Sequence, residues 1–169
     1  KWNFLKFDPG LVGGHCLPVD PYYLASIALK KNFKTKVTLS GRKVNDSMNI
    51  FVFNEIKKFL KSKNKSINSG KILLIGISYK PGIADMRNSL NFKILKKLMQ
   101  KKAQVRAFDP YVKDDVKSKY KIIDKISIKN KFDAIVFLSK HKKFETEYKK
   151  LNIKENKTKL LDPFEYYKR

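Results

Sequence analysis

The hydrophobic positions of this chain follow one pattern up to residue 66 and another from residue 70 onwards. In the first part, apolar residues recur every three or four positions, which is the spacing of an α-helix. This spacing predicts a helix that Pro21 opens, with Asp20 as its N-cap, and that runs to Lys31. It also predicts a second, much longer helix over 36–63.

The longer helix carries a wide apolar stripe whose members lie four positions apart: Val44, Met48, Val52, Ile56 and Leu60. Such a stripe usually packs against the rest of the same chain. A helix this long, with few other elements near it, can also bury its stripe against a second subunit. We therefore expect a homodimer that forms through this helix.

The polar stretch 63–70 ends in a glycine and divides the chain into a helical unit, 1–66, and a second unit, 70–169. In the second unit, near-continuous apolar runs predict strands covered on both faces, and helical segments separate them as in parallel β–α–β units. Strands are expected at 71–77, 103–108, 132–138 and 159–161, with a helix at 91–101. The predicted fold class is α/β: a helical central segment followed by a Rossmann-like parallel sheet.

Net charge raises the question of a nucleic-acid partner. The chain has 169 residues, with 39 Lys and Arg against 15 Asp and Glu, for a formal charge of +24. Neutralisation of phosphates by such cations dominates nucleic-acid binding. Arg occurs only at positions 42, 87, 106 and 169, so the forked side chains that usually bind phosphates and bases are scarce. We expect no specific nucleic-acid partner, and a basic nucleic-acid-binding module remains the alternative.

Cysteine content and hydropathy narrow the class further. One cysteine, Cys16, excludes a disulfide framework and a multi-thiolate zinc site, so no metal is expected. The apolar runs are too short to span a bilayer, and no charged-then-apolar leader opens the sequence. These features favour a cytoplasmic protein with no membrane partner.

The loop after the first predicted strand lacks the dinucleotide-binding fingerprint. That fingerprint needs three glycines at G-x-G-x-x-G spacing, and here three other residues follow Gly76. The loop instead carries two cations, Lys80 and Arg87, close to a helix that Asn88 and Ser89 are placed to cap. These cations indicate either an anion site or ordinary surface charge.

Asp109 ends the second predicted strand, at the place of a ribose-binding carboxylate in dinucleotide-binding sheets. It stands directly before Pro110, so on residue type alone we predict that it is a turn residue. The second unit thus has the form of a nucleotide-binding sheet without a dinucleotide cradle.

The most reactive side chains gather in the glycine-rich loop 13–21, where His15 precedes Cys16. A lone cysteine is more often a small buried hydrophobe than a nucleophile. This one lies before a predicted helix N-terminus, with Asp20 four residues on. Helix N-termini and cationic neighbours favour the reactive thiolate form. Both interpretations stay open on residue type.

Taken together, these motifs resemble the UDP-glucose/GDP-mannose dehydrogenase family, and most of all its branch that acts on UDP-N-acetylhexosamines. The resemblance extends over nearly the whole chain and covers only the family's central and C-terminal portions. It lies in 1–24 (KWNFLKFDPGLVGGHCLPVDPYYL), 41–46 (GRKVND), 76–81 (GISYKP), 85–89 (DMRNS), 108–110 (FDP) and His141.

This resemblance implies a two-step, NAD-dependent oxidation of the C6 hydroxyl of a UDP-N-acetylhexosamine to a carboxylate. Cys16 corresponds to the cysteine that attacks the intermediate aldehyde, which gives a thiohemiacetal and, after the second oxidation, a thioester that water hydrolyses. Asp20 corresponds to an aspartate that positions the water and handles protons.

The resemblance also implies which residues bind the substrate and the cofactor. Lys80 corresponds to a UDP-sugar-binding lysine, and Arg87 to a residue that reaches NAD from the C-terminal domain. The UDP-sugar loop corresponds to Leu5, Lys6, Phe7, Asp8, Pro9 and Gly13.

Two departures from the family pattern bear on function. Val19 stands where the UDP-glucose branch has a lysine, which fits the N-acetylhexosamine branch and removes one cofactor contact. The family's N-terminal NAD-binding domain has no counterpart in these residues, so we expect the chain alone to be inactive. A nucleotide-binding scaffold without catalysis is a further alternative.

Overall fold

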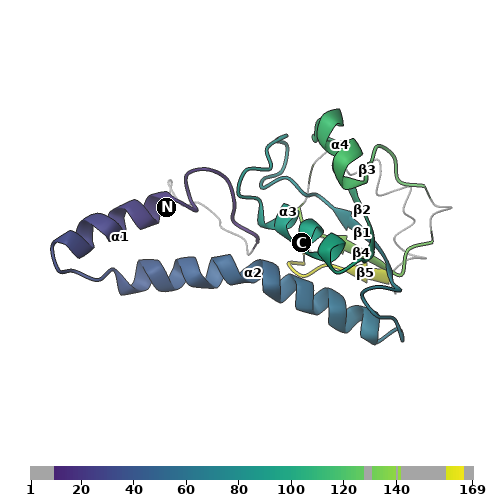
Figure 1. Cartoon of the computed structure of the whole chain (residues 1–169), viewed down its shortest axis with the longest axis horizontal. Helices are drawn as coiled ribbons and strands as arrows, with labels where there is room; N and C mark the ends of the chain where they lie inside the picture. Colours follow the sequence, from purple (N-terminus) through teal and green to yellow (C-terminus); the bar gives the residue numbers. More distant parts are fainter. Residues whose placement is uncertain (1–9, 128–130, 140, 142–158, 166–169) are drawn as a thin grey trace, which may run out of the picture.

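The computed structural model of the chain describes residues 10–127, 131–139, 141 and 159–165. A helical hairpin forms one end of the molecule and an α/β sheet the other (Figure 1). The hairpin consists of α1 (Asp20–Lys30) and the first half of α2 (Lys36–Lys61). With 26 residues, α2 is about 39 Å long, and its second half runs beneath the sheet.

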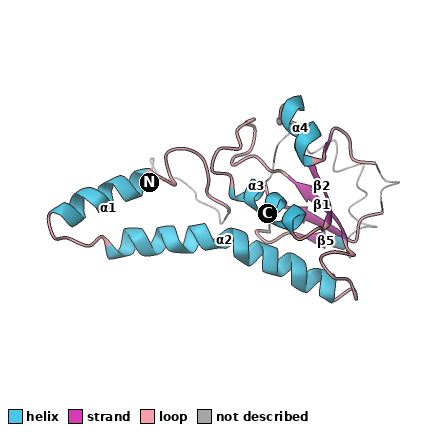
Figure 2. Cartoon of the chain, viewed as in Figure 1, coloured by secondary structure: helices cyan, strands magenta, loops and turns pink. Residues whose placement is uncertain are grey.

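The sheet has five parallel strands in the order β3-β2-β1-β4-β5. Figure 2 shows the strands in magenta and the helices in cyan. The strands are β1 (Lys71–Ile75), β2 (Gln104–Phe108), β3 (Ile122–Ile123), β4 (Ala134–Phe137) and β5 (Leu160–Leu161). The remaining helices are α3 (Leu90–Gln100) and α4 (Asp114–Tyr120). The predicted arrangement, a helical segment followed by a Rossmann-like parallel sheet, is confirmed.

Strand order fixes where a ligand can bind. From β1 the chain moves outward to β2 and β3, and then returns to the other side of β1 for β4 and β5. In such sheets, the crevice for ligands lies beyond the carboxyl ends of the two strands at which the order reverses. These strands are β1 and β4, and the loops that follow them touch. A Cβ atom added to Gly76, which has φ +80°, would lie 2.7 Å from the Cβ of Ser139.

The central strand is covered on both faces, as its apolar run predicts. Ile72 and Leu74 belong to one core cluster, and Leu73 and Ile75 to the other. Alternate residues of a strand point to opposite faces, so each cluster covers one face of the sheet. All four side chains are fully buried.

The apolar stripe of α2 changes its environment half-way along the helix. Val52, Ile56 and Leu60 are fully buried against the sheet unit, where each contributes about 2 kcal/mol through burial. Val44 is 62% exposed, and Val37 at the start of the helix is 88% exposed. The same chain therefore covers only the second half of the stripe.

Several element boundaries and caps differ from the predictions. The N-cap of α1 is Val19 without a side-chain hydrogen bond, so the prediction of Asp20 as N-cap is wrong; Asp20 lies inside the first turn. The cap of α3 is Ser89, as predicted, and it accepts a hydrogen bond from the amide of Phe92.

No helix in the described part of the chain is long and apolar enough to cross a bilayer. The division into 1–66 and 70–169 stays a prediction.

Candidate active site

Cys16 lies in the loop that leads into α1, and its thiol is free and exposed. This exposure is inconsistent with the interpretation of Cys16 as a small buried hydrophobe. The carbonyl oxygen of Cys16 accepts hydrogen bonds from the amides of Val19 (2.8 Å) and Asp20 (2.9 Å). The loop thus turns straight into the helix, and Asp20 follows Cys16 by one tight turn.

Two contacts attach the cysteine loop to the rest of the molecule. Asn45 of α2 holds the backbone of Val12 from both sides: its Nδ2 donates to the Val12 carbonyl (3.0 Å), and its Oδ1 accepts from the Val12 amide (3.3 Å). Leu11, one residue earlier, is 7% exposed and belongs to the main core cluster. The start of the loop is therefore fixed on α2.

The two glycines before Cys16 allow the cysteine loop to lie directly on the loop between β1 and α3. A Cβ atom added to Gly13 would lie 2.7 Å from the carbonyl oxygen of Asn88. Gly14 has φ +98°, and a Cβ there would lie 2.9 Å from the ring of Tyr79. Only glycine fits both positions without displacing the neighbouring loop. The structure therefore brings Cys16 to the carboxyl edge of the sheet.

Asp109 is 1% exposed, and its carboxylate anchors the loop between β1 and α3 through hydrogen bonds. Its Oδ2 accepts from the amides of Ile77 and Ser78, both at 2.9 Å, and from the Ser78 hydroxyl at 2.9 Å. Its Oδ1 accepts from the amide of Tyr111, which does form a turn. Asp109 is thus a turn residue, as predicted, and in addition three of its hydrogen bonds go to another strand's loop.

Electrostatics around Asp109 favour its charged form. Burial alone would raise the pKa of Asp109, but the hydrogen bond from His141, together with those from the amides of Ser78 and Tyr111, outweighs that effect. The pKa of Asp109 consequently lies below its ordinary value.

Lys80 and Arg87, the two cations of this loop, differ in their surroundings. Lys80 is exposed. Arg87 is paired with Asp85: its Nε and Nη2 donate to the carboxylate at 3.0 and 2.7 Å, and 70% of the Arg87 side chain remains exposed. The pKa of Asp85 is lowered mainly by these hydrogen bonds from the Arg87 side chain, with a smaller effect from the charge of His15. The predicted two-cation anion site thus contains a carboxylate as well.

The structure describes only some of the predicted site residues. Cys16, Gly13, Lys80 and Arg87 lie in two loops that pack on each other, and Asp20 is the first residue of α1, directly after the cysteine loop. The others, Leu5, Lys6, Phe7, Asp8 and Pro9, lie outside the described residues.

Three residues that hold these loops together were not among the predicted site residues: Tyr79, Asp109 and His141. The signal for two of them was present in the sequence. Asp109 follows β2 and His141 follows β4, so both come after strands whose carboxyl ends share one edge.

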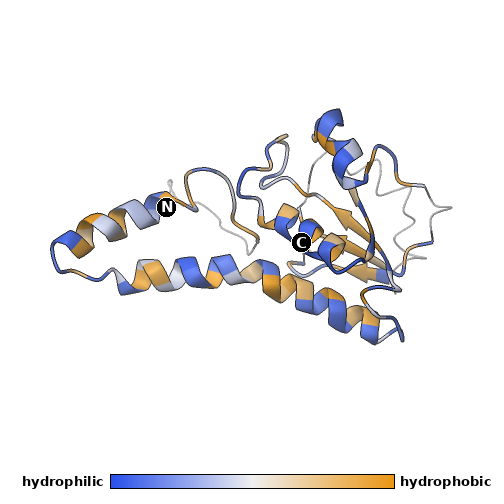
Figure 3. Ribbon diagram, in the orientation of Figure 1, coloured by the Kyte–Doolittle hydropathy of each residue, from blue (hydrophilic) through white to orange (hydrophobic). Residues whose placement is uncertain are grey.

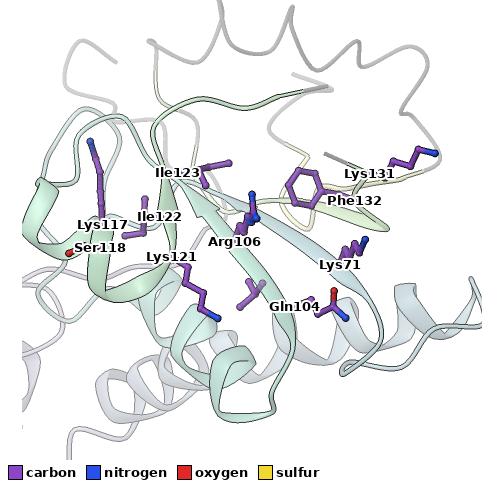
Figure 4. A pocket seen from close by; sticks show the side chains of 11 residues that line it. Lys71, Gln104, Arg106, Lys117, Ser118, Lys121, Ile122, Ile123, Lys131 and Phe132 are labelled. Atoms are coloured by element: carbon purple, nitrogen blue, oxygen red, sulfur yellow. The ribbon is translucent and has the colours of Figure 1, made fainter. Parts of the chain in front are cut away.

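A pocket of about 920 Å³ lies elsewhere, over β2, β3 and α4 (Figure 4). Its cationic side chains point in different directions, and none of the predicted site residues lines it. Lys117 donates to Asp114 (2.9 Å) and Asp124 (2.6 Å), which raises the pKa of Lys117. We therefore place the candidate site at the carboxyl edge. Within the described ranges, no three His, Cys, Asp or Glu side chains are grouped to hold a metal ion.

Comparison with known protein families identifies two matching domains. Residues 73–169 match the UDP-binding domain of the UDP-glucose/GDP-mannose dehydrogenase family, and residues 1–47 match the central domain of that family. The chain belongs to this family. The membership inferred from the cysteine segment and the other motifs is thus confirmed.

Two curated relatives and one solved structure show which members are similar. The UDP-N-acetyl-D-glucosamine 6-dehydrogenase of Salmonella typhi is 35% identical over 147 residues, which is 86% of this chain and 35% of the relative. The UDP-N-acetyl-D-mannosamine dehydrogenase of Methanocaldococcus jannaschii is 32% identical over 94% of this chain and 34% of its own length. The structure of UDP-D-ManNAc dehydrogenase from Pyrococcus horikoshii superimposes with a TM-score of 0.71 at 27% identity, over 95% of this chain and 35% of that one.

These comparisons relate the chain to dehydrogenases of UDP-N-acetylhexosamines. The family consists of NAD-dependent dehydrogenases, and residues 73–169 match its UDP-binding domain. The chain spans about a third of the length of the curated relatives it matches.

Proposed function

We propose that this chain supplies the catalytic cysteine and the UDP-binding domain of a UDP-N-acetylhexosamine 6-dehydrogenase. The observation that carries the proposal is the packing of Gly13 and Gly14 on Tyr79 and Asn88. This contact places an exposed thiol beside the loop of a parallel sheet at which nucleotides usually bind. In this proposal, the loop after β1 binds the nucleotide of the substrate, and the Cys16 thiol reacts with the sugar of the same molecule.

For the nucleotide end of the substrate, we assign Lys80 and the amino end of α3. Lys80 is exposed at the tip of the loop after β1, and a lysine is a common ligand for phosphate oxygens. The first amides of a helix add further donors for an anion. The segment 5–9 and Gly13 complete the UDP-sugar site in this proposal.

For the sugar end, we assign Cys16 as the nucleophile. Its sulfur attacks the C6 aldehyde, a C–S bond forms, and the carbonyl oxygen takes up a proton to give the thiohemiacetal. Loss of hydride from C6 and of the proton from the thiohemiacetal hydroxyl gives the thioester, and water then cleaves the C–S bond, which releases the carboxylate and restores the thiol. Asp20 lies one turn from Cys16 and is proposed to position this water and accept its proton.

NAD, when bound, accepts the hydride in each of the two oxidations. The residue of this chain that fits a contact with NAD is Arg87, because its guanidinium remains largely exposed while Asp85 fixes its orientation. We expect the 169-residue chain alone to leave NAD unreduced, since it spans only about a third of the length of the curated relatives it matches. Turnover of NAD by the purified chain contradicts this expectation.

A homodimer through the helical hairpin is part of the proposal. Figure 3 shows hydrophobic residues in orange along the hairpin, and many of their side chains are exposed. They include Tyr22, Tyr23, Leu24, Ile27, Leu29, Phe33, Val37, Leu39, Val44, Ile50 and Phe51. An exposed apolar surface of this extent is typical of an interface, and a second copy of the chain offers a matching surface.

We place the reaction in the cytoplasm, because a nucleophilic thiol must stay reduced. Cys16 is exposed, and an oxidising compartment would convert such a thiol to a disulfide or an oxidised acid.

The decisive test uses a UDP-N-acetylhexosamine whose C6 is a ¹³C-labelled aldehyde, because a thiol adds to an aldehyde without a cofactor. With the chain in excess, we expect the C6 resonance to move to that of a thiohemiacetal. Cys16→Ala removes this resonance and leaves UDP binding unchanged. If the C6 spectrum is unaltered although the excess of chain has bound all of the UDP-sugar, the assignment of Cys16 as the nucleophile is contradicted.

A second experiment tests the nucleotide site by calorimetry with UDP. Lys80→Ala is expected to weaken UDP binding about tenfold, the size of one charge-assisted hydrogen bond. Lys101→Ala removes an exposed lysine from the opposite, carboxyl end of α3 and serves as the matched control with unchanged affinity. Equal losses in the two variants would indicate general attraction by charge instead of a site.

A further inference from the structure

A buried histidine lies under the loop that carries Lys80. His141 is fully buried, as is Ser78, and Asp109 is 1% exposed. The Nδ1 atom of His141 accepts a hydrogen bond of 2.9 Å from the amide of Gly82. Its Nε2 atom lies 3.4 Å from Oδ2 of Asp109 and 3.4 Å from the Ser78 hydroxyl.

This geometry fixes the tautomer of the ring. A ring nitrogen that accepts from an N–H carries no hydrogen of its own, so the proton of the neutral imidazole is on Nε2. Nε2 then faces the Asp109 carboxylate, which already holds the amides of Ile77 and Ser78. His141 therefore links two parts of the loop. It contacts the Gly82 amide directly, and it lies against Asp109, which holds the amides of Ile77 and Ser78.

The contact with His141 is important for Gly82 because little else packs there. Gly82 is exposed, and a Cβ atom added to it would have no neighbour within 4 Å. Its backbone has φ +80°, which glycine adopts without strain but which is only one of many conformations open to it. A single hydrogen bond to a buried ring selects this conformation.

Between the two anchored ends lie the residues that face the proposed site. Tyr79 presents its ring to Gly14 of the cysteine loop, and its amide donates to the Asp85 carbonyl (3.1 Å). Lys80 follows, exposed at the tip of the loop. A shift at Gly82 would move Lys80 first, since only Pro81 separates them.

We propose that His141 is a positioning residue for substrate binding: by accepting a hydrogen bond from Gly82, it holds Lys80 in the orientation that binds the nucleotide. The ligand named here rests on the proposed function. The ring does not touch the substrate and acts through the backbone of the loop.

Two substitutions of His141 test separately the contact of Nδ1 with Gly82 and the contact of Nε2 with Asp109. In His141→Asn, the side-chain oxygen takes the place of Nδ1 and keeps an acceptor for Gly82. In His141→Gln, the longer amide reaches the place of Nε2 and keeps a donor for Asp109, while the acceptor for Gly82 is lost. Both variants retain a polar side chain at the same buried position.

Calorimetry with UDP and thermal unfolding are measured for both variants of the full chain. We expect His141→Gln to bind UDP about tenfold more weakly, whereas His141→Asn stays within about twofold of the original chain. The melting temperatures need not follow this order, because Asn loses the contact with Asp109. If His141→Asn loses as much affinity for UDP as His141→Gln, or more, the positioning role is overturned.

Hydrogen exchange at the Gly82 amide provides a readout that needs no ligand. We expect faster exchange of this amide in His141→Gln and near-original protection in His141→Asn. Failure of the original chain to bind UDP contradicts the proposed function, while the exchange result still decides whether His141 holds Gly82. Equal exchange in the two variants overturns the inference on its own.

Discussion

The two ends of the molecule differ in the burial of their apolar side chains, although the helix α2 runs through both. The sheet unit buries them, and the helical hairpin leaves many exposed. In the sheet unit, the second half of α2 packs its stripe against the core, and Ile56 is fully buried. In the hairpin, the first half of the same helix leaves Val44 62% exposed. Helical periodicity predicts that a face will be buried, but it does not say what covers it. The exposed half is the part of the stripe for which a second subunit is proposed.

The largest expected effect comes from truncating the stripe at matched positions in the two ends. Ile56→Ala removes fully buried methyl groups and should cost about 3–4 kcal/mol in the free energy of unfolding. Val44→Ala should cost less than about 0.5 kcal/mol in the isolated chain, because that side chain faces solvent. Urea unfolding at low protein concentration measures both.

The same positions sharpen the comparison through self-association. Val44→Glu places a charge on the exposed stripe and should shift a dimer to monomer in sedimentation experiments, with the fold intact. A dimer that survives Val44→Glu, or a chain that is monomeric throughout, would contradict the proposed use of the hairpin.

A second, smaller contrast concerns two aspartates. Asp109→Asn removes the charge that holds the amides of Ile77 and Ser78, and should cost about 2 kcal/mol near neutral pH. In the hairpin, Asp46 pairs with Arg42 and accepts from the Tyr22 hydroxyl, but its side chain is 43% exposed. Asp46→Asn should therefore cost no more than about 0.5 kcal/mol.

The effect of Asp109 also depends on pH, and the direction follows from its lowered pKa. A group whose pKa is lower in the folded chain contributes stability above its ordinary value of 3.8. This contribution disappears as the pH falls through the folded pKa. The difference in melting temperature between the original chain and Asp109→Asn should thus be constant from pH 7 to 5 and shrink below about pH 4. A difference that grows in acid would contradict the assignment.

Substitutions at two glycines are expected to have modest effects of opposite sign. Gly14→Ala places a methyl group against the Tyr79 ring at φ +98° and should cost about 1–2 kcal/mol. Gly41 lies inside α2 with open space around it, so Gly41→Ala should stabilise the chain by about 0.5–1 kcal/mol. Thermal unfolding of both variants checks the signs. Stabilisation by Gly14→Ala would show that the two loops are not in contact.

Much of the fold could be predicted from the sequence, because long elements carry strong local patterns. The helix α2 and the strand β1 were predicted from spacing and from an apolar run, with ends within two residues. The helix α4 and the strand β3 were missed. They have seven and two residues, too few for a periodic pattern to emerge, and α4 buries no residue fully.

The candidate site was predictable where its residues are close in the sequence and not where they are distant. The loop around Cys16 combines glycines, a thiol and a helix start within nine positions, so its chemistry was visible locally. Asp109 binds amides 31 and 32 positions away, and His141 binds an amide 59 positions away. Such partners are brought together only by strand order. The pairing of Arg87 with Asp85 was local, and a carboxylate two positions before the cation was its signal.

The contact between Tyr79 and Gly14 has a consequence for protein engineering. Because one aromatic ring fills the space left by a missing side chain on the other loop, the two loops form a matched pair of surfaces. A graft that exchanges residues 76–89 for those of another dehydrogenase would place a different side chain at position 79, against the unchanged Gly14. Transplanting this recognition loop therefore requires residues 10–20 to travel with it as a single module.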